Sequence, residues 1–126
     1  MKFQTLLTIN AVVALVYGIC FVLVSSTVLS IYGIAEGPGQ QLMSQFFGVA
    51  LISLGLLSWF IRNVTDSAVQ RAVVLSALIG DIVGVIVSLM GTLSGVMSTF
   101  GWTAVGIYLL LALGFASLQF RKPAAS

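Results

Sequence analysis

Residues 72–90 read AVVLSALIGDIVGVIVSLM, an apolar stretch in which Asp81 is the one charged side chain. A helix needs about 20 mainly apolar residues to cross the hydrocarbon core of a bilayer. Three further stretches have this length and character and carry no charge, namely residues 6–24, 42–61 and 102–120. The sequence therefore predicts four transmembrane helices.

The composition of the whole chain also indicates a lipid environment. Of its 126 residues, 60% are hydrophobic and 6% are charged, and the mean hydropathy is +1.18. A soluble domain is about a quarter charged, because its surface must face water. A chain of this length is one domain, so we expect residues 1–126 to form a single all-α, integral membrane four-helix bundle.

Turn-forming residues separate the predicted spans. A Gly-Pro-Gly sequence at residues 37–39 precedes the second span, residues 63–67 form a short polar link, and residues 91–101 form a link rich in glycine and serine. The one long connection runs over residues 25–41. Its apolar side chains are expected to rest in the headgroup layer: Val28, Leu29, Ile31 and Tyr32.

The basic residues indicate how the spans are oriented. All five flank the same ends of the predicted spans: Lys2, Arg62, Arg71, Arg121 and Lys122. Because cytoplasmic loops carry an excess of lysine and arginine, we expect both termini to be cytoplasmic. The alternative is a signal peptide cleaved after Ser26, which would leave three spans with the termini on opposite sides.

Several function classes lack the residues they need. The chain has no histidine and one cysteine, Cys20, which excludes histidine-based metal ligation, histidine general bases and an intrachain disulfide. The basic residues are too sparse to follow nucleic-acid phosphates. No phosphate-binding glycine loop or pair of catalytic carboxylates occurs. We therefore expect no enzyme, no catalytic residue, no metal or cofactor, and no nucleic-acid partner.

Small residues recur at helical spacing in each predicted span. Steps of three and four keep side chains on one face of a helix, where small residues let two helices approach closely in lipid. The residues expected at such contacts are Gly18, Gly48, Gly55, Ala77, Gly84, Ser88, Gly91 and Gly106. These faces can pack within one chain or against another copy, and the sequence leaves both open.

Asp81 is the position that composition does not explain. It lies ten residues after Arg71, or about 15 Å along a helix, near the bilayer centre. A charge at that depth costs roughly 3 kcal/mol on insertion scales, so Asp81 should be protonated, paired, or facing water inside the bundle. We expect a hydrogen-bonded group of Asp81 with Tyr17, Asn10 or Tyr108. Such a group is a relay or ligand anchor, or a contact that fixes helix register.

Short pieces spread over nearly the whole chain carry a resemblance: Asn10, Tyr17-Gly18, Tyr32-Gly33, Phe47-Gly48, Gly80-Asp81 and Gly101-Trp102. They resemble small uncharacterised bacterial four-helix membrane proteins, loosely similar to the DoxX-like families. The resemblance implies a multi-pass protein of the bacterial cytoplasmic (inner) membrane and no particular activity. Small multidrug transporters also have four short spans, but they depend on a glutamate in the first helix, where this chain has Asn10 and no acid.

Three functions remain open at this point. The favoured one is a non-enzymatic membrane protein that acts as a homo-oligomer or as an accessory subunit of a larger membrane complex, with membrane lipids as its surroundings. The first alternative is a small proton- or ion-coupled transporter or channel that uses Asp81. The second is a lipid- or quinone-binding protein with a pocket around Asp81 and Tyr17.

Overall fold

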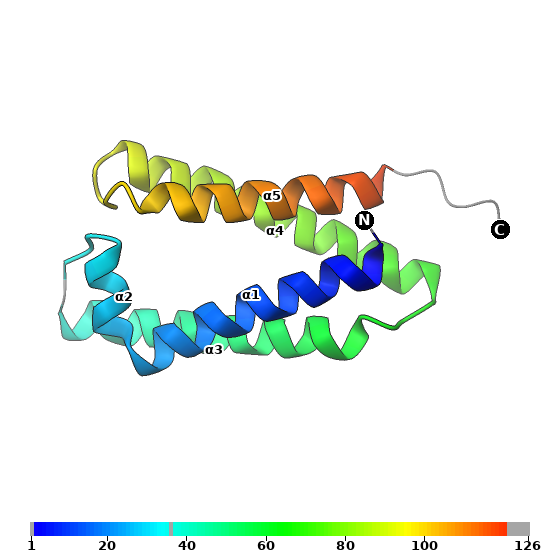
Figure 1. Ribbon diagram of the computed structural model, residues 1–126, viewed down its shortest axis with the longest axis horizontal. Helices are drawn as coiled ribbons and strands as arrows, with labels where there is room; N and C mark the ends of the chain where they lie inside the picture. Colours follow the sequence, from blue (N-terminus) through cyan, green and yellow to red (C-terminus); the bar gives the residue numbers. More distant parts are fainter. Residues whose placement is uncertain (1, 36, 121–126) are drawn as a thin grey trace.

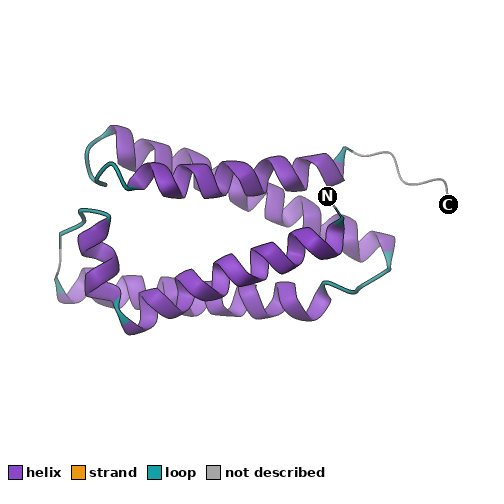
Figure 2. Ribbon diagram, in the orientation of Figure 1, coloured by secondary structure: helices purple, strands orange, loops and turns teal. Residues whose placement is uncertain are grey.

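The structure, a computed structural model, describes residues 2–35 and 37–120 (Figure 1). Figure 2 shows that this part of the chain is helical, joined by short loops and without strands. Its helices are α1 (Phe3–Leu23), α2 (Ser25–Ile31), α3 (Pro38–Ile61), α4 (Ser67–Leu93) and α5 (Gly101–Gln119). All except α2 are long and apolar enough to cross a membrane. The prediction of an all-helical protein with four such helices is confirmed, and only Val24 and Phe120 of the predicted spans lie outside them.

The four long helices form two antiparallel pairs. Helix α1 packs along α3, and α4 packs along α5. Figure 1 shows the pairs converging at the end of the molecule that holds the N-terminus and diverging toward the opposite end. The start of α1 and the end of α5 both lie at the converging end, as an even number of spans requires.

A cluster of buried apolar side chains joins the two pairs where they converge. It consists of Leu6, Leu7, Val74, Leu78, Leu111, Ala112 and Phe115. Phe115 of α5 and Leu7 of α1 have exposed fractions of 0% and 1%. Leu6 also packs against Gly114, where a Cβ atom would lie 3.0 Å from the leucine Cδ1. The cluster therefore ties α1 to both helices of the other pair.

Helices α1 and α3 touch through their backbones. A Cβ on Gly18 would lie 2.8 Å from the carbonyl oxygen of Gly48, and a Cβ on Gly48 would lie 2.6 Å from that of Gly18. Two turns along α3, Gly55 faces Leu15 just as closely, at 2.7 Å from its Cγ. In lipid, such close approach supplies the van der Waals contact that holds helices together.

The other small residues expected at helix contacts differ in their surroundings. Ser88 is buried, and Ala77 is partly buried beside the apolar cluster. Gly91 faces Met97 of the connection that follows its own helix, at 3.1 Å from the Cε atom. Gly106 faces open space, with no neighbouring atom of the described chain within 4 Å of a Cβ placed there. A contact of Gly106 with another chain stays a prediction.

Helix α2 turns back over the divergent end of the molecule (Figure 1). Its residues Val28 and Leu29, and Tyr32 directly after it, are buried within the protein, whereas Ile31 is half exposed. These side chains are buried because α2 packs against α1 and α3, and their place in the headgroup layer stays a prediction.

Two hydrogen bonds link the end of α2 to the connection between α4 and α5. The Ser98 amide donates to the carbonyl of Tyr32 at 2.7 Å, and the Ser98 hydroxyl donates to the carbonyl of Ile31 at 2.9 Å. Gly33 permits this approach through its positive φ of 71°, a conformation that glycine adopts without strain. The two helix pairs are thus linked at both ends.

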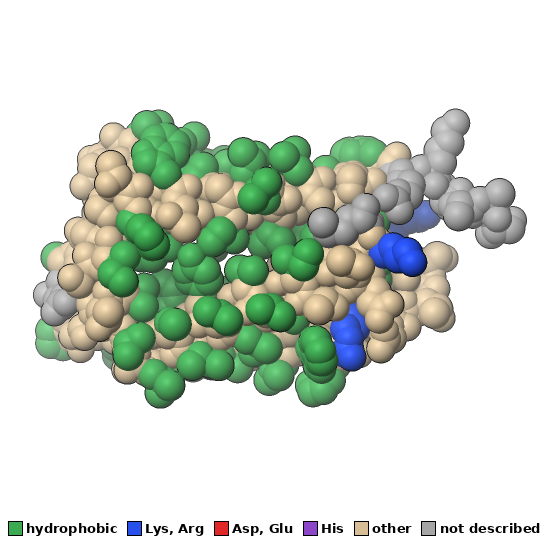
Figure 3. Space-filling model, in the orientation of Figure 1, with side chains coloured by type: hydrophobic (Ala, Val, Ile, Leu, Met, Phe, Trp, Pro, Cys, Tyr) green, Lys and Arg blue, Asp and Glu red, His purple; other side chains and the backbone are tan. Residues whose placement is uncertain are grey.

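The outer surface of the bundle is apolar and its basic side chains are confined to one end. Large hydrophobic residues are exposed on all four long helices, and Figure 3 shows them along the length of one face. Lysine and arginine side chains gather at the converging end (Figure 3), where Lys2, Arg62 and Arg71 flank the helix ends. Arg121 and Lys122 lie outside the described residues.

The Gly18–Gly48 contact predicts opposite effects for two glycine substitutions. Gly48→Ala should lower the free energy of unfolding by about 1–3 kcal/mol, because the new methyl group meets backbone that cannot move aside. Gly106→Ala should leave it unchanged or raise it by up to about 1 kcal/mol, since alanine favours the helix and meets no neighbour. Unfolding of the purified variants in detergent measures both. Equal stability of the two variants would contradict the close α1–α3 contact.

Candidate functional site

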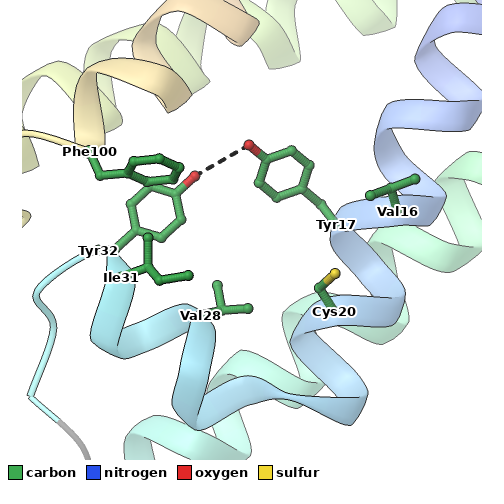
Figure 4. Close-up of a pocket in the computed structure, with 7 residues that line it drawn as sticks. All are labelled: Val16, Tyr17, Cys20, Val28, Ile31, Tyr32 and Phe100. Carbon is green, nitrogen blue, oxygen red and sulfur yellow. Dashed lines mark hydrogen bonds between the residues drawn. The ribbon is translucent and has the colours of Figure 1, made fainter.

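A cleft of about 270 Å³ lies between the two helix pairs toward their divergent end (Figure 4). Its lining consists of Val16, Tyr17, Cys20, Val28, Ile31, Tyr32 and Phe100. These residues come from α1, from α2 and the residue after it, and from the residue before α5. The polar atoms they offer are two tyrosine hydroxyls and one thiol, so the cleft is an apolar space with a small polar region.

The two tyrosine hydroxyls meet across the cleft, as Figure 4 shows. The Tyr32 hydroxyl donates to that of Tyr17 at 3.5 Å, which is long for such a bond and therefore weak. The Tyr32 ring is held by Phe100, edge-on, with 5.1 Å between ring centroids. Burial, followed by the hydrogen bond to Tyr17, raises the pKa of the Tyr32 hydroxyl. Tyr32 therefore stays protonated and able to donate.

Asp81 lies on the inward side of α4, outside the cleft lining. Only 9% of its surface is exposed, and its Oδ2 atom has no hydrogen-bond partner among the described residues. A buried polar atom without a partner costs about 1–3 kcal/mol. Asp81 therefore lowers the stability of this bundle and does not hold its helices together.

The expected hydrogen-bonded group around Asp81 is not formed. Asn10 donates from Nδ2 to the Ser58 hydroxyl at 2.9 Å, because it lies on the side of α1 that packs against α3. Tyr17 pairs instead with Tyr32. Asn10 is thus part of the α1–α3 contact and not of the candidate site.

Three of the four expected site residues nevertheless belong to one polar row. The Tyr108 ring packs over Gly84, one turn from Asp81. Tyr108 lies within electrostatic range of both Asp81 and Tyr17, and Tyr32 lies within range of Tyr17 and Tyr108. The row runs from Tyr32 at the cleft through Tyr17 and Tyr108 to Asp81.

Sequence reasoning missed Tyr32 as a site residue, together with the other lining residues Val16, Cys20, Val28, Ile31 and Phe100. Tyr32 was assigned to the long connection over residues 25–41, with its side chain expected in the headgroup layer. The available signal was the run from Ser25 to Ile31, seven residues without glycine or proline, which is long enough for two helical turns.

The site contains no cluster of metal-binding side chains. Among the described residues, no group of three or more His, Cys, Asp or Glu side chains could hold a metal ion. Cys20, which is free and partly buried, lies on the cleft wall. The arrangement suits the binding of a lipophilic molecule, with two tyrosine hydroxyls to orient it.

Comparison of the chain with protein-family models, with curated protein sequences and with solved structures finds no match. The class of the protein is defined by its fold and its site. The described chain is all-helical, with four helices long and apolar enough to span a membrane and a cleft between two helix pairs. The resemblance to the DoxX-like families stays a prediction.

Asp81 lacks a hydrogen-bond partner among the described residues, whereas Asp66 has two. Replacing aspartate by leucine should therefore change the free energy of unfolding in opposite directions at these two positions. Asp81→Leu, which branches at the same carbon without polar atoms, should raise the free energy of unfolding by about 1–3 kcal/mol. Asp66→Leu should lower it by about 1 kcal/mol, because the Asp66 carboxylate accepts from the amides of Ala68 and Val69 at the start of α4. Unfolding in detergent gives both values. A loss of stability in Asp81→Leu would mean that the carboxyl group is bonded after all.

Proposed function

We propose that this chain is a non-enzymatic membrane protein that binds a lipophilic molecule in the cleft between its helix pairs. The observation that carries the proposal is the apolar lining of the cleft, interrupted by the hydroxyl pair of Tyr17 and Tyr32. Ligand sites are typically apolar with a few placed polar groups that orient the ligand. A cleft at membrane depth is open to molecules dissolved in the bilayer, which are themselves lipophilic.

The proposed setting is the cytoplasmic (inner) membrane of a bacterium, with both termini cytoplasmic. The gathering of Lys2, Arg62 and Arg71 at the converging end supports this orientation, because basic residues favour the cytoplasmic side. The divergent end and the mouth of the cleft beside α2 then face the outer half of the bilayer.

A second candidate function is assembly, as a homo-oligomer or as an accessory subunit of a larger membrane complex. The observation that favours it is a row of small residues on α4, Ala72, Ser76 and Gly80, all exposed and spaced by four. Gly80 has no neighbouring atom of the described chain within 4 Å of a Cβ placed there. Small residues at this spacing let a helix of another chain approach closely.

The assembly candidate predicts that a bulky side chain on this row separates the partners. Gly80→Leu should reduce the oligomeric or partner-bound fraction about tenfold, because one lost close contact of roughly 1.4 kcal/mol has this effect. Native mass spectrometry in a mild detergent measures the fraction. Ala50→Leu, on the exposed surface of α3, is the control and should have no effect. An unchanged assembly in Gly80→Leu would reject this face of α4 as the interface.

The binding proposal predicts that a lipophilic molecule shields Cys20. As the one cysteine of the chain, Cys20 reports on the cleft through its reaction with methyl methanethiosulfonate, followed by intact mass. Decanol should slow this reaction several-fold in the purified protein, because the alcohol occupies the space beside the thiol.

The control moves the reporter out of the cleft. In the double variant Cys20→Ala, Val12→Cys, the thiol sits on the same helix at a position with 52% of its surface exposed, and decanol should not change its reaction rate. Equal slowing at both positions would reflect detergent effects alone and would reject the proposed cleft binding.

A further inference from the structure

The unpartnered carboxyl group of Asp81 lies on the side of α4 that packs in the apolar cluster. Asp81 lies seven residues after Val74, about two helical turns, and so shares its side of α4. Val74 packs in the cluster with Leu6 and Leu7 of α1. The side of α4 that carries Asp81 therefore points toward the cluster that α1, α4 and α5 share, beyond which the pairs begin to separate.

The same relation holds for the two nearest tyrosines. Tyr17 lies eleven residues after Leu6, about three turns along α1, and Tyr108 lies seven residues before Phe115, about two turns along α5. Leu6 and Phe115 are members of the cluster that closes the converging end. Tyr17, Tyr108 and Asp81 therefore lie on the sides of α1, α5 and α4 that carry members of this cluster, each two or three turns from one of those members.

The charged and aromatic side chains of the row that ends at Asp81 indicate which chemical class of ligand would bind there. Arg71, ten residues away on α4, is the only other charged residue of the four long helices. A carboxylate without a counter-ion attracts a cation and repels an anion. The faces of tyrosine and phenylalanine rings also attract organic cations, by about 0.5–2 kcal/mol, and Tyr17, Tyr32, Tyr108 and Phe100 supply such rings along the row.

The weakest contact of the row is the one that a ligand must displace. The Tyr32–Tyr17 hydrogen bond is 3.5 Å long, so an ammonium group that takes its place exchanges a weak bond for stronger, charge-assisted ones. The free Oδ2 atom of Asp81 is the acidic acceptor of the same row. The hydrocarbon part of the same molecule then fills the apolar cleft.

We propose that the ligand of the cleft is an amphiphilic amine, whose protonated nitrogen binds the Asp81 carboxylate among Tyr17, Tyr32 and Tyr108 and whose hydrocarbon chain occupies the cleft. This inference rests on the proposed function and names the class of its ligand. The ammonium group supplies the hydrogen-bond donor and the positive charge that Asp81 lacks among the described residues.

Shielding of Cys20 by decylamine, compared with decanol, tests the inference, since the two probes share a chain length and differ in charge. Half-maximal shielding of the purified protein should need about tenfold less decylamine than decanol. Asp81→Asn should raise the decylamine concentration to that of decanol and leave the decanol value unchanged. Asp66→Asn, the same substitution at the N-cap of α4, should keep the preference for the amine.

Each contrary outcome has a separate meaning. Equal shielding by the two probes, or a preference for the amine that survives in Asp81→Asn, overturns the inference and leaves cleft binding intact. Stronger shielding by decan-2-one than by decylamine also overturns it, since a neutral carbonyl would then be the preferred group. Shielding by none of the probes overturns the proposed function too. The comparison of probes on the unaltered protein decides the matter even if Asp81→Asn does not fold.

Discussion

The apolar cluster around Leu7, Leu78 and Phe115 is the constraint on which the rest of the structure depends. In this cluster, buried side chains of the two helix pairs pack against one another. The other helix contacts are mostly made within each pair. Joined at one end, the pairs diverge toward the other (Figure 1). The second link, from Ser98 to the carbonyls of Ile31 and Tyr32, is made by loops rather than by packed helices. The cleft is the space that these two links leave between them.

Each helix pair is held by contacts that remain effective in lipid. Without a hydrophobic driving force between helices, association depends on close packing and on buried hydrogen bonds. The α1–α3 pair has both, in the backbone approach of Gly18 to Gly48 and in the Asn10–Ser58 hydrogen bond. The α4–α5 pair packs Tyr108 over Gly84. The cleft is lined by side chains of α1 and α2, by Tyr32 and by Phe100 before α5, so a molecule entering it meets packed elements and has to order little of the protein, which favours affinity.

In the polar row from Tyr32 to Asp81, the most acidic group, the Asp81 carboxyl group, has an oxygen atom without a hydrogen-bond partner in the described chain. Asn10 and Ser58 satisfy one another, and Ser88 donates to the carbonyl of Gly84 at 2.6 Å within its own helix. Asp81, at nearly the same depth of burial as Ser88, has an oxygen without a hydrogen bond. Among the described residues, Asp81 Oδ2 is the fully buried side-chain atom without a hydrogen-bond partner, and such an atom is suited to an external partner, which is the basis for assigning the ligand's nitrogen to Asp81.

The sequence by itself determined the four spans, because hydropathy is a sum over neighbouring residues and needs no partner. Helical rise also predicted that Asp81 lies near the bilayer centre. Only the tertiary structure decided that Asn10 turns toward Ser58, that α2 brings Tyr32 back over the cleft, and that Asp81 finds no hydrogen bond. These features depend on which face of each helix meets which neighbour. In lipid that choice is made by the fit of small and large side chains between helices distant in the chain, which no local pattern encodes.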